Sequence, residues 1–234
     1  MRLLGVDGCR GGWLVAEATS LEAVPSFHLI ERFEEITRLA GRGEAMACVD
    51  IPISLTEARR GCDAEARAML GWPRSASVFT PPCRAALHGR SDGERRALNL
   101  LSTGRSLSAQ ALGILPKIRE VDDVMTPRLQ RLIRETHPEV VFAGLRRTGA
   151  GVAAPKKTGT GRRQRLALLP SSFAAAAPTR LTRPFPAGVA ALDDYVDALA
   201  ALVTVIRLAH GRAGRLPPHG EDRDERGLVM EIVY

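Results

Sequence analysis

A helix near the end of the chain carries two aspartates among apolar residues, and this arrangement constrains the fold more than any other segment. Residues 194–209 have the apolar periodicity of a buried helix. Asp194 and Asp197 are three positions apart, so their side chains share one face of that helix. Neighbouring carboxylates repel each other unless a cation neutralises them, and oxygen ligands suit a divalent metal ion. Helix capping is the alternative, but it explains Asp193 or Asp194 and not Asp197.

Two further aspartates stand where predicted strands end. Residues 3–7 and 13–19 have the pattern of strands joined by a glycine-rich hairpin turn, and Asp7 ends the first of them. The apolar segment 45–50 is also a predicted strand, and its last residue is Asp50. Turn chemistry is the alternative for each acid, because aspartate is common at strand ends and before glycine. We predict that both strand-end acids meet the helical aspartates in space.

Eight short segments, in order from residue 5 to the end of the chain, form a wider pattern. They are Gly5-Val6-Asp7-Gly8-Cys9-Arg10-Gly11-Gly12-Trp13, Asp50-Ile51-Pro52-Ile53, Arg59-Arg60-Gly61-Cys62-Asp63, Ser77-Val78-Phe79-Thr80-Pro81-Pro82, Pro116-Lys117-Ile118-Arg119-Glu120-Val121-Asp122, Glu135-Thr136-His137-Pro138-Glu139, Lys156-Lys157-Thr158 and Asp194-Tyr195-Val196-Asp197-Ala198-Leu199. This pattern resembles the uncharacterised family called domain of unknown function 429, which is described as predicted nucleases with an RNase H-like fold. The order of the acids is also similar to the Holliday-junction resolvase branch of that superfamily.

The resemblance implies an α/β fold and a metal-dependent activity. The expected fold is an RNase H-like mixed sheet flanked by helices, formed by residues 1–234 as a single domain, with a helical insertion over 56–128 after the fourth strand. The expected activity is hydrolysis of phosphodiester bonds in DNA or RNA by two Mg²⁺ or Mn²⁺ ions. The metal ligands that the resemblance implies are Asp7, Asp50, Asp194 and Asp197. Asp7 would bridge both ions, and Asp197 or Glu135 would orient the attacking water.

Hydrophobic periodicity predicts where the regular elements lie. The expected strands are 3–7, 13–19, 26–31, 45–50, 131–136 and 227–233, and the expected helices are 33–41, 56–70, 93–113, 138–145, 162–169 and 194–209. Thr136 and Glu139 have the spacing of a capping box at the start of one of these helices, which favours a structural role for Glu139. Glu135 stands beside them at a strand end and stays open as a catalytic candidate.

The net charge of +7 is concentrated in one part of the chain. Residues 140–192 contain no Asp or Glu, and their basic residues are Arg146, Arg147, Lys156, Lys157, Arg162, Arg163, Arg165, Arg180 and Arg183. Such a basic field favours a nucleic acid as partner, and a solvated loop is the alternative. The candidate phosphate-binding residues are Lys117, Arg119, Lys156, Lys157, Arg162 and Arg163. Aromatic residues make up only 4% of the chain, so no stacking platform for single strands is evident.

Composition excludes several other classes of protein. The chain has no signal-peptide pattern and no apolar run of about 20 residues, so we expect a cytoplasmic protein without a membrane partner. The four cysteines lack a C-x-x-C spacing, which disfavours a zinc site and predicts buried free thiols.

Two alternatives to a nuclease remain at this point. One is a phosphotransferase related to the sugar-kinase and actin-like superfamily, although such proteins repeat the core twice and this chain shows no repeat. The other is a noncatalytic nucleic-acid-binding module that kept an RNase H-like fold. A degenerate module should have lost some of the acids, whereas all four candidate positions are aspartates.

Overall fold

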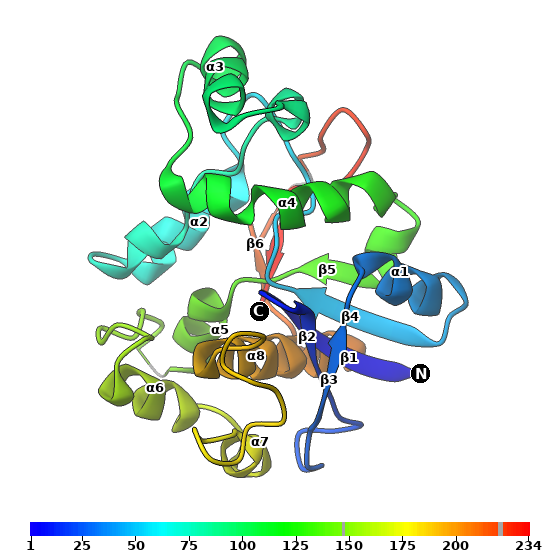
Figure 1. Cartoon of the computed structure of the whole chain (residues 1–234). Coiled ribbons are helices and arrows are strands. Elements are labelled where there is room, and N and C mark those ends of the chain that lie inside the picture. The colour runs from blue at the N-terminus through cyan, green and yellow to red at the C-terminus, as the bar shows by residue number, and fades with distance from the viewer. Residues whose placement is uncertain (147, 220–221) are drawn as a thin grey trace.

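A five-stranded mixed sheet forms the centre of the protein, as the computed structural model shows for residues 1–146, 148–219 and 222–234 (Figure 1). The strand order is β3-β2-β1-β4-β5. The first three strands pair antiparallel, and β4 and β5 continue the sheet parallel to β1. The strands are β1 (Arg2–Cys9), β2 (Gly12–Glu17), β3 (Ser26–Ile30), β4 (Ala45–Val49) and β5 (Ile133–Glu135). The predicted α/β class with a mixed sheet is therefore confirmed.

The hairpin predicted at the start of the chain joins β1 to β2. Cys9 pairs with Gly12, so Arg10 and Gly11 alone form the turn. Gly12 has φ +131°, and a Cβ at this position would lie 2.3 Å from the carbonyl oxygen of Ile30. Glycine is therefore required there both for its conformation and for space.

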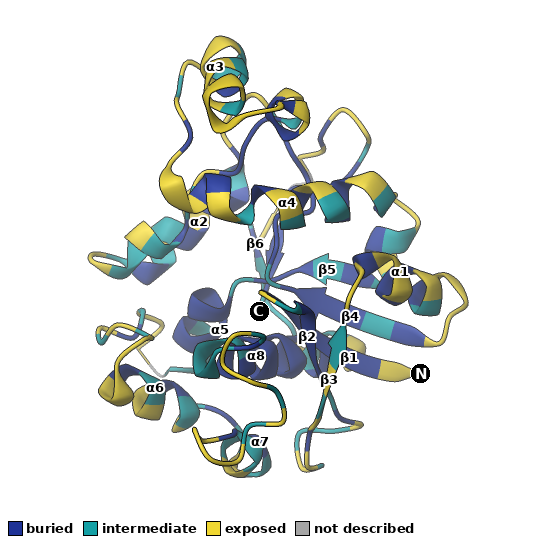
Figure 2. Ribbon diagram, viewed as in Figure 1, coloured by how far each residue is buried: buried dark blue, intermediate teal, exposed yellow. Residues whose placement is uncertain are grey.

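Helices cover both faces of the sheet (Figure 1). One core contains Val6, Trp13 and Val49 from the sheet, together with residues of α1 (Phe33–Gly41) and α4 (Ala109–Val124). The opposite core is dominated by α8 (Leu192–Ala209), with contributions from α5 (Pro138–Leu145) and α7 (Ser171–Ala176). Figure 2 shows α8 as a largely buried helix, in contrast to the exposed faces of α3 and α6.

Gly5 lets α8 lie directly on β1. A Cβ at Gly5 would come within 2.2 Å of the carbonyl oxygen of Ala198 and of the amide nitrogen of Leu202. No side chain can occupy that space without moving the backbone, so the glycine sets the distance between the strand and the helix. This packing brings the start of α8 toward the carboxyl ends of β1 and β4.

The segment between β4 and β5 is largely helical. It contains α2 (Gly61–Leu70), η1 (Arg74–Ser77), η2 (Arg84–His88), α3 (Asp92–Thr103), α4 and η3 (Leu129–Arg131). The single helix predicted over 93–113 is wrong, because Gly104 ends α3 in the left-handed conformation and Ser108 caps a new helix. The helix predicted over 56–70 begins only at Gly61.

The last part of the chain also differs from the prediction. It contains α6 (Gly159–Leu166), α7, α8, β6 (Arg215–Leu216) and β7 (Ile232–Val233). The strand predicted over 227–233 is therefore much shorter, and it pairs with a β6 that no sequence pattern indicated.

The predicted capping box at the start of α5 is wrong. His137 is the N-cap residue, while Thr136 Oγ1 donates instead to the carbonyl oxygen of Val233 at 2.7 Å. Glu139 pairs with Arg165, so a distant partner replaces the expected local one.

Two features expected from composition can be checked across the described ranges. All four cysteines are free and buried, as predicted. A search of those ranges finds no helix with both the length and the apolar character that a membrane span requires.

Candidate functional site

Alternation along two parallel strands puts Asp7 and Asp50 on the same face of the sheet. Val6 of β1 is in register with Val49 of β4, and the amide of Asp50 donates to the carbonyl oxygen of Val6 at 3.0 Å. Val6 and Val49 both belong to the core on the α1 and α4 side. The next residue in each strand therefore faces α8, because side chains alternate between the two faces. Asp7 and Asp50 consequently lie side by side on the face toward α8. The prediction that the first strand ends at Asp7 is wrong, because β1 stays paired with β2 as far as Cys9.

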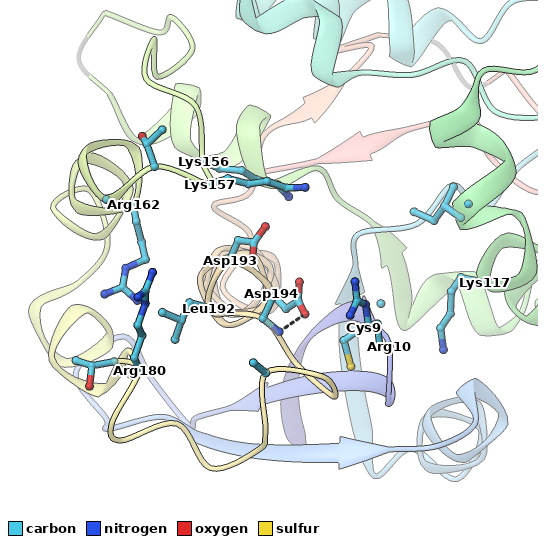
Figure 3. Close-up of a pocket in the computed structure, with 18 of the residues that line it drawn as sticks. Cys9, Arg10, Lys117, Lys156, Lys157, Arg162, Arg180, Leu192, Asp193 and Asp194 are labelled. Atoms are coloured by element: carbon cyan, nitrogen blue, oxygen red, sulfur yellow. Dashed lines mark hydrogen bonds between the residues drawn. The ribbon is translucent and has the colours of Figure 1, made fainter.

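The two helical aspartates approach from α8 and have different partners. Asp194 Oδ2 accepts the backbone N–H of Ala191, the N-cap residue, at 2.8 Å (Figure 3). The capping alternative therefore accounts for one oxygen of Asp194. Asp197 is only 2% exposed, and its Oδ2 lies 2.5 Å from the ammonium Nζ of Lys156. Capping cannot explain Asp197, whose buried carboxylate instead pairs with the partly exposed Lys156.

All four candidate aspartates line one cavity of about 440 Å³. They reach it from β1, from the residue after β4 and from the first turns of α8. Glu135 lines the same cavity, as do Arg74 and His137, which sequence reasoning missed. Buried imidazole loses hydration, which lowers the pKa of His137.

Burial and mutual repulsion make these carboxyls reluctant to ionise. Burial raises the pKa of Asp50 to about 7, and the charge of Asp197 adds to that rise. Burial likewise raises the pKa of Asp194 to about 6, while its bond from Ala191 opposes the rise. For Asp7 the pKa is well above its usual range because of burial and then the charges of Asp197, Asp50 and Asp194. A bound cation would oppose these shifts and favour the ionised form of the carboxyls.

Glu135 belongs to the other face of the sheet, although it lines the same cavity. It is in register with Val49, so it points away from the face that carries Asp50. Its Oε1 accepts from Arg60 Nη2 at 2.5 Å, and its Oε2 accepts from the amide of Ile53 at 2.8 Å. Burial raises the pKa of Glu135 to about 7, and the Arg60 charge opposes that rise. Both carboxylate oxygens are therefore engaged by groups of the protein.

The four aspartates fit a hard divalent cation by their chemistry, since carboxylate oxygens are the ligands that Mg²⁺ and Mn²⁺ prefer. Within the described ranges, however, no three Asp, Glu, His or Cys side chains form a group that could hold a metal ion as they stand. The positive charge that the structure places at Asp197 is the Lys156 ammonium.

A larger cavity of about 1320 Å³, shown in Figure 3, is lined by basic side chains together with Asp193 and Asp194. Both cavities are lined by Gly8, Ile114, Lys156, Lys157 and Asp194. The basic side chains around the larger cavity are Arg10, Lys117, Lys156, Lys157, Arg162 and Arg180. They come from the β1–β2 turn, α4, α6 and the segments flanking α6 and α7, so the fold gathers positive charge from distant parts of the chain.

Four of the six predicted phosphate-binding residues line the basic cavity, and two lie elsewhere. Arg119 pairs with Asp123 along an exposed face of α4 at 3.8 Å. Arg163 donates to Thr160 at 3.2 Å near the start of α6. Arg147, counted in the basic field, lies outside the described residues. Arg10 was missed, although its place in the turn after Asp7 was a signal for it.

Arg165 belongs to residues 140–192, the segment without Asp or Glu, but its side chain does not add to the basic surface. It is 1% exposed, and its guanidinium donates to both oxygens of Glu139, at 2.7 and 2.8 Å through Nη2. A buried, paired arginine contributes little to attraction at the surface. A polyanion can therefore meet fewer positive charges than the number of basic residues in 140–192 indicates.

A comparison with known families gives one match. The family described as a protein of unknown function (DUF429) matches residues 5–222. No curated protein and no solved structure matches the chain. Because the match spans most of the sequence and includes all four candidate aspartates, the chain belongs to the DUF429 family.

Proposed function

We propose that this protein is a metal-dependent nuclease that hydrolyses phosphodiester bonds of DNA or RNA. The observation that carries the proposal is the juxtaposition of two cavities, one lined by four aspartates and the other by basic side chains. The first is suited to metal-assisted hydrolysis and the second to a phosphate backbone. An RNase H-like fold is part of the proposal, and the strand order β3-β2-β1-β4-β5 supports it.

The residues that would hold Mg²⁺ or Mn²⁺ are Asp7, Asp50, Asp194 and Asp197. Bound ions would supply an activated water and stabilise the leaving oxygen. Glu135, whose oxygens bond to Arg60 and Ile53, would shape the cavity wall and position its neighbours.

The basic residues would hold and orient the nucleic acid. Lys157 and Arg162 follow one another closely at the start of α6, whereas Arg10 and Lys117 come from the β1–β2 turn and from α4. Lys117 also stacks over the ring of Trp13, 4.4 Å from its centroid, which fixes the stem of this side chain. A phosphate chain in this cavity would pass beside Asp194, which lines both cavities.

Asp194→Asn tests the nuclease directly. We expect cleavage of nucleic acid with Mg²⁺ or Mn²⁺ to fall by about 10²-fold or more, the scale on which loss of a group that stabilises the transition state acts. Binding should persist or become tighter, because one negative charge facing the phosphates is removed. Single-stranded, duplex, hybrid and branched DNA and RNA serve as substrates. Asp123→Asn, at an exposed carboxylate on α4, is the control. Unchanged cleavage by Asp194→Asn would contradict the assignment.

A noncatalytic nucleic-acid-binding module is the second candidate. The ion pair between Lys156 and Asp197 favours it, because an internal cation neutralises one of the acids without metal. Salt-sensitive binding with no cleavage of any substrate would support this alternative. Saturable ATP binding without nucleic-acid binding would instead point to the phosphotransferase alternative.

A further inference from the structure

Lys156 brings a positive charge into the acidic cavity from outside α8 and the sheet. It lies in the turn before α6, and its ammonium reaches Asp197 across 41 positions of the chain. The two side chains differ in exposure, at 40% for Lys156 and 2% for Asp197. The lysine therefore enters the cavity from the solvent side and meets a carboxylate that is already buried.

A buried network holds the turn that carries Lys156. Arg165 Nη1 donates to the carbonyl oxygens of Ala154 and Gly161, at 2.9 and 3.0 Å. The other nitrogens of Arg165 bond to Glu139 at the start of α5. A Cβ at Gly161 would lie 2.0 Å from the carbonyl oxygen of Pro155, so the turn packs tightly on the helix. The fold thus determines where the Lys156 side chain begins.

The charge of Lys156 acts on the whole group of acids. Besides pairing with Asp197, it opposes the rise in the pKa of Asp7, Asp50 and Asp194. A divalent cation bound by these aspartates would have the same electrostatic effect at the same place. Lysine and metal would therefore compete for one set of carboxylates.

We propose that Lys156 is an internal counter-ion of the carboxylate cavity, which occupies Asp197 in the metal-free protein and must release it when a divalent cation binds. This inference rests on the metal site of the proposed function. Lys156 then has a role other than phosphate binding. It is not itself a metal ligand, but its charge lowers the affinity of the aspartates for a metal ion.

The pairing of Lys156 with Asp197 in the metal-free protein is tested by a double-mutant cycle. The free energy of unfolding of Lys156→Met, Asp197→Asn and the double variant is measured by urea denaturation in EDTA. Lys156→Met leaves the buried Asp197 carboxylate without its counter-ion, and Asp197→Asn removes the carboxylate paired with Lys156, so each should lose stability. The double variant should lose clearly less than the sum of the two. Additive losses would overturn the counter-ion role, and this result does not depend on any nuclease activity.

The competition is tested by titrating Mn²⁺ alone into the full chain and measuring heat. Lys156→Met should bind Mn²⁺ about tenfold more tightly than the parent, because no ammonium must be displaced. The affinity of Lys156→Arg for Mn²⁺ should be closer to that of the parent, since arginine retains the charge. Lys157→Met removes one charge beside the same cavity and is the matched control.

The comparison of Lys156→Met with Lys157→Met separates this inference from the nuclease proposal. Equal effects of Lys156→Met and Lys157→Met would overturn the inference, even if the parent cleaves nucleic acid. A specific gain for Lys156→Met would support it, even if no substrate is cleaved. Failure of every variant to bind Mn²⁺ would overturn both the competition and the metal site.

Discussion

At the scale of single residues, the site depends on which side of a strand a carboxylate occupies. Asp7 and Asp50 face α8, whereas Glu135, one register position away, faces Arg60. Acidic residues near the carboxyl ends of three neighbouring strands thus fall into two environments. A count of acids at strand ends would have treated all three alike.

The carboxyl of Asp50 should make metal-free stability depend on pH. Its pKa rises from the usual 3.8 to about 7 on folding, so the folded protein binds this proton more tightly than the unfolded chain does. The resulting stabilisation is complete below pH 3.8 and is lost as the pH rises through about 7. Asp50→Asn should remove this contribution, which has a maximum slope of about 1.4 kcal/mol per pH unit.

Urea denaturation of parent and Asp50→Asn in EDTA, between pH 4 and 8, measures this difference. Asp123→Asn, at an exposed carboxylate, should show the parent pH dependence. Parallel curves for the parent and Asp50→Asn would show that Asp50 titrates normally in the folded protein.

At the scale of elements, the contact between β1 and α8 determines how far the aspartates of α8 lie from Asp7 and Asp50. Gly5 lies two residues before Asp7, and it faces Ala198, the residue that follows Asp197. The same close approach that buries the helix also sets the distance across the candidate site. Local sequence patterns predict both elements but not their separation.

Gly5→Ala should destabilise the protein because the new methyl group would meet backbone atoms at 2.2 Å. We expect a loss of about 1–3 kcal/mol or more, the range for overpacking in a core. Gly113→Ala is the control. It adds a methyl group to α4 that meets no atom within 4 Å apart from its chain neighbours and the nearby backbone of its own helix, and helix propensity should make it neutral or up to about 1 kcal/mol more stable. Urea midpoints measure both, and a Gly5→Ala variant as stable as the parent would contradict the tight contact.

At the scale of the whole molecule, an acidic cavity and a basic cavity lie next to each other. Lys156, Lys157 and Asp194 belong to both linings. The basic side chains converge from four separate segments, so the distribution of charge on the folded surface differs from its distribution along the chain. Binding of a polyanion and chemistry at the acids should therefore be separable by mutation.

The salt dependence of nucleic-acid binding should identify the contacting residues. Lys157→Gln, Arg162→Gln and Arg180→Gln should each weaken binding and lower the slope of log K against log[salt] by up to about 0.9 for a duplex. Arg119→Gln, at a residue paired with Asp123 on α4, should change the slope little. Binding titrations at several salt concentrations measure the slopes. A change for Arg119→Gln as large as that for Arg162→Gln would contradict the basic cavity as the binding surface.

The sequence by itself determined the features that depend on neighbouring residues. The β1–β2 hairpin follows from its glycines, and the buried helix that carries Asp194 and Asp197 follows from a periodicity of 3.6. The end of an apolar run places Asp50 directly after β4, whereas β1 continues past Asp7 because the hairpin extends its pairing to Cys9. These patterns are local, and the tertiary structure preserved them.

Only the tertiary structure decided which charges have partners. Arg165 is paired with Glu139 and Lys156 with Asp197, although neither partner is near in sequence. Glu139 was expected to cap a helix, and Lys156 was expected to contact phosphate. The physical reason is that burial and ion pairing depend on distances between atoms of distant segments, which no local pattern contains.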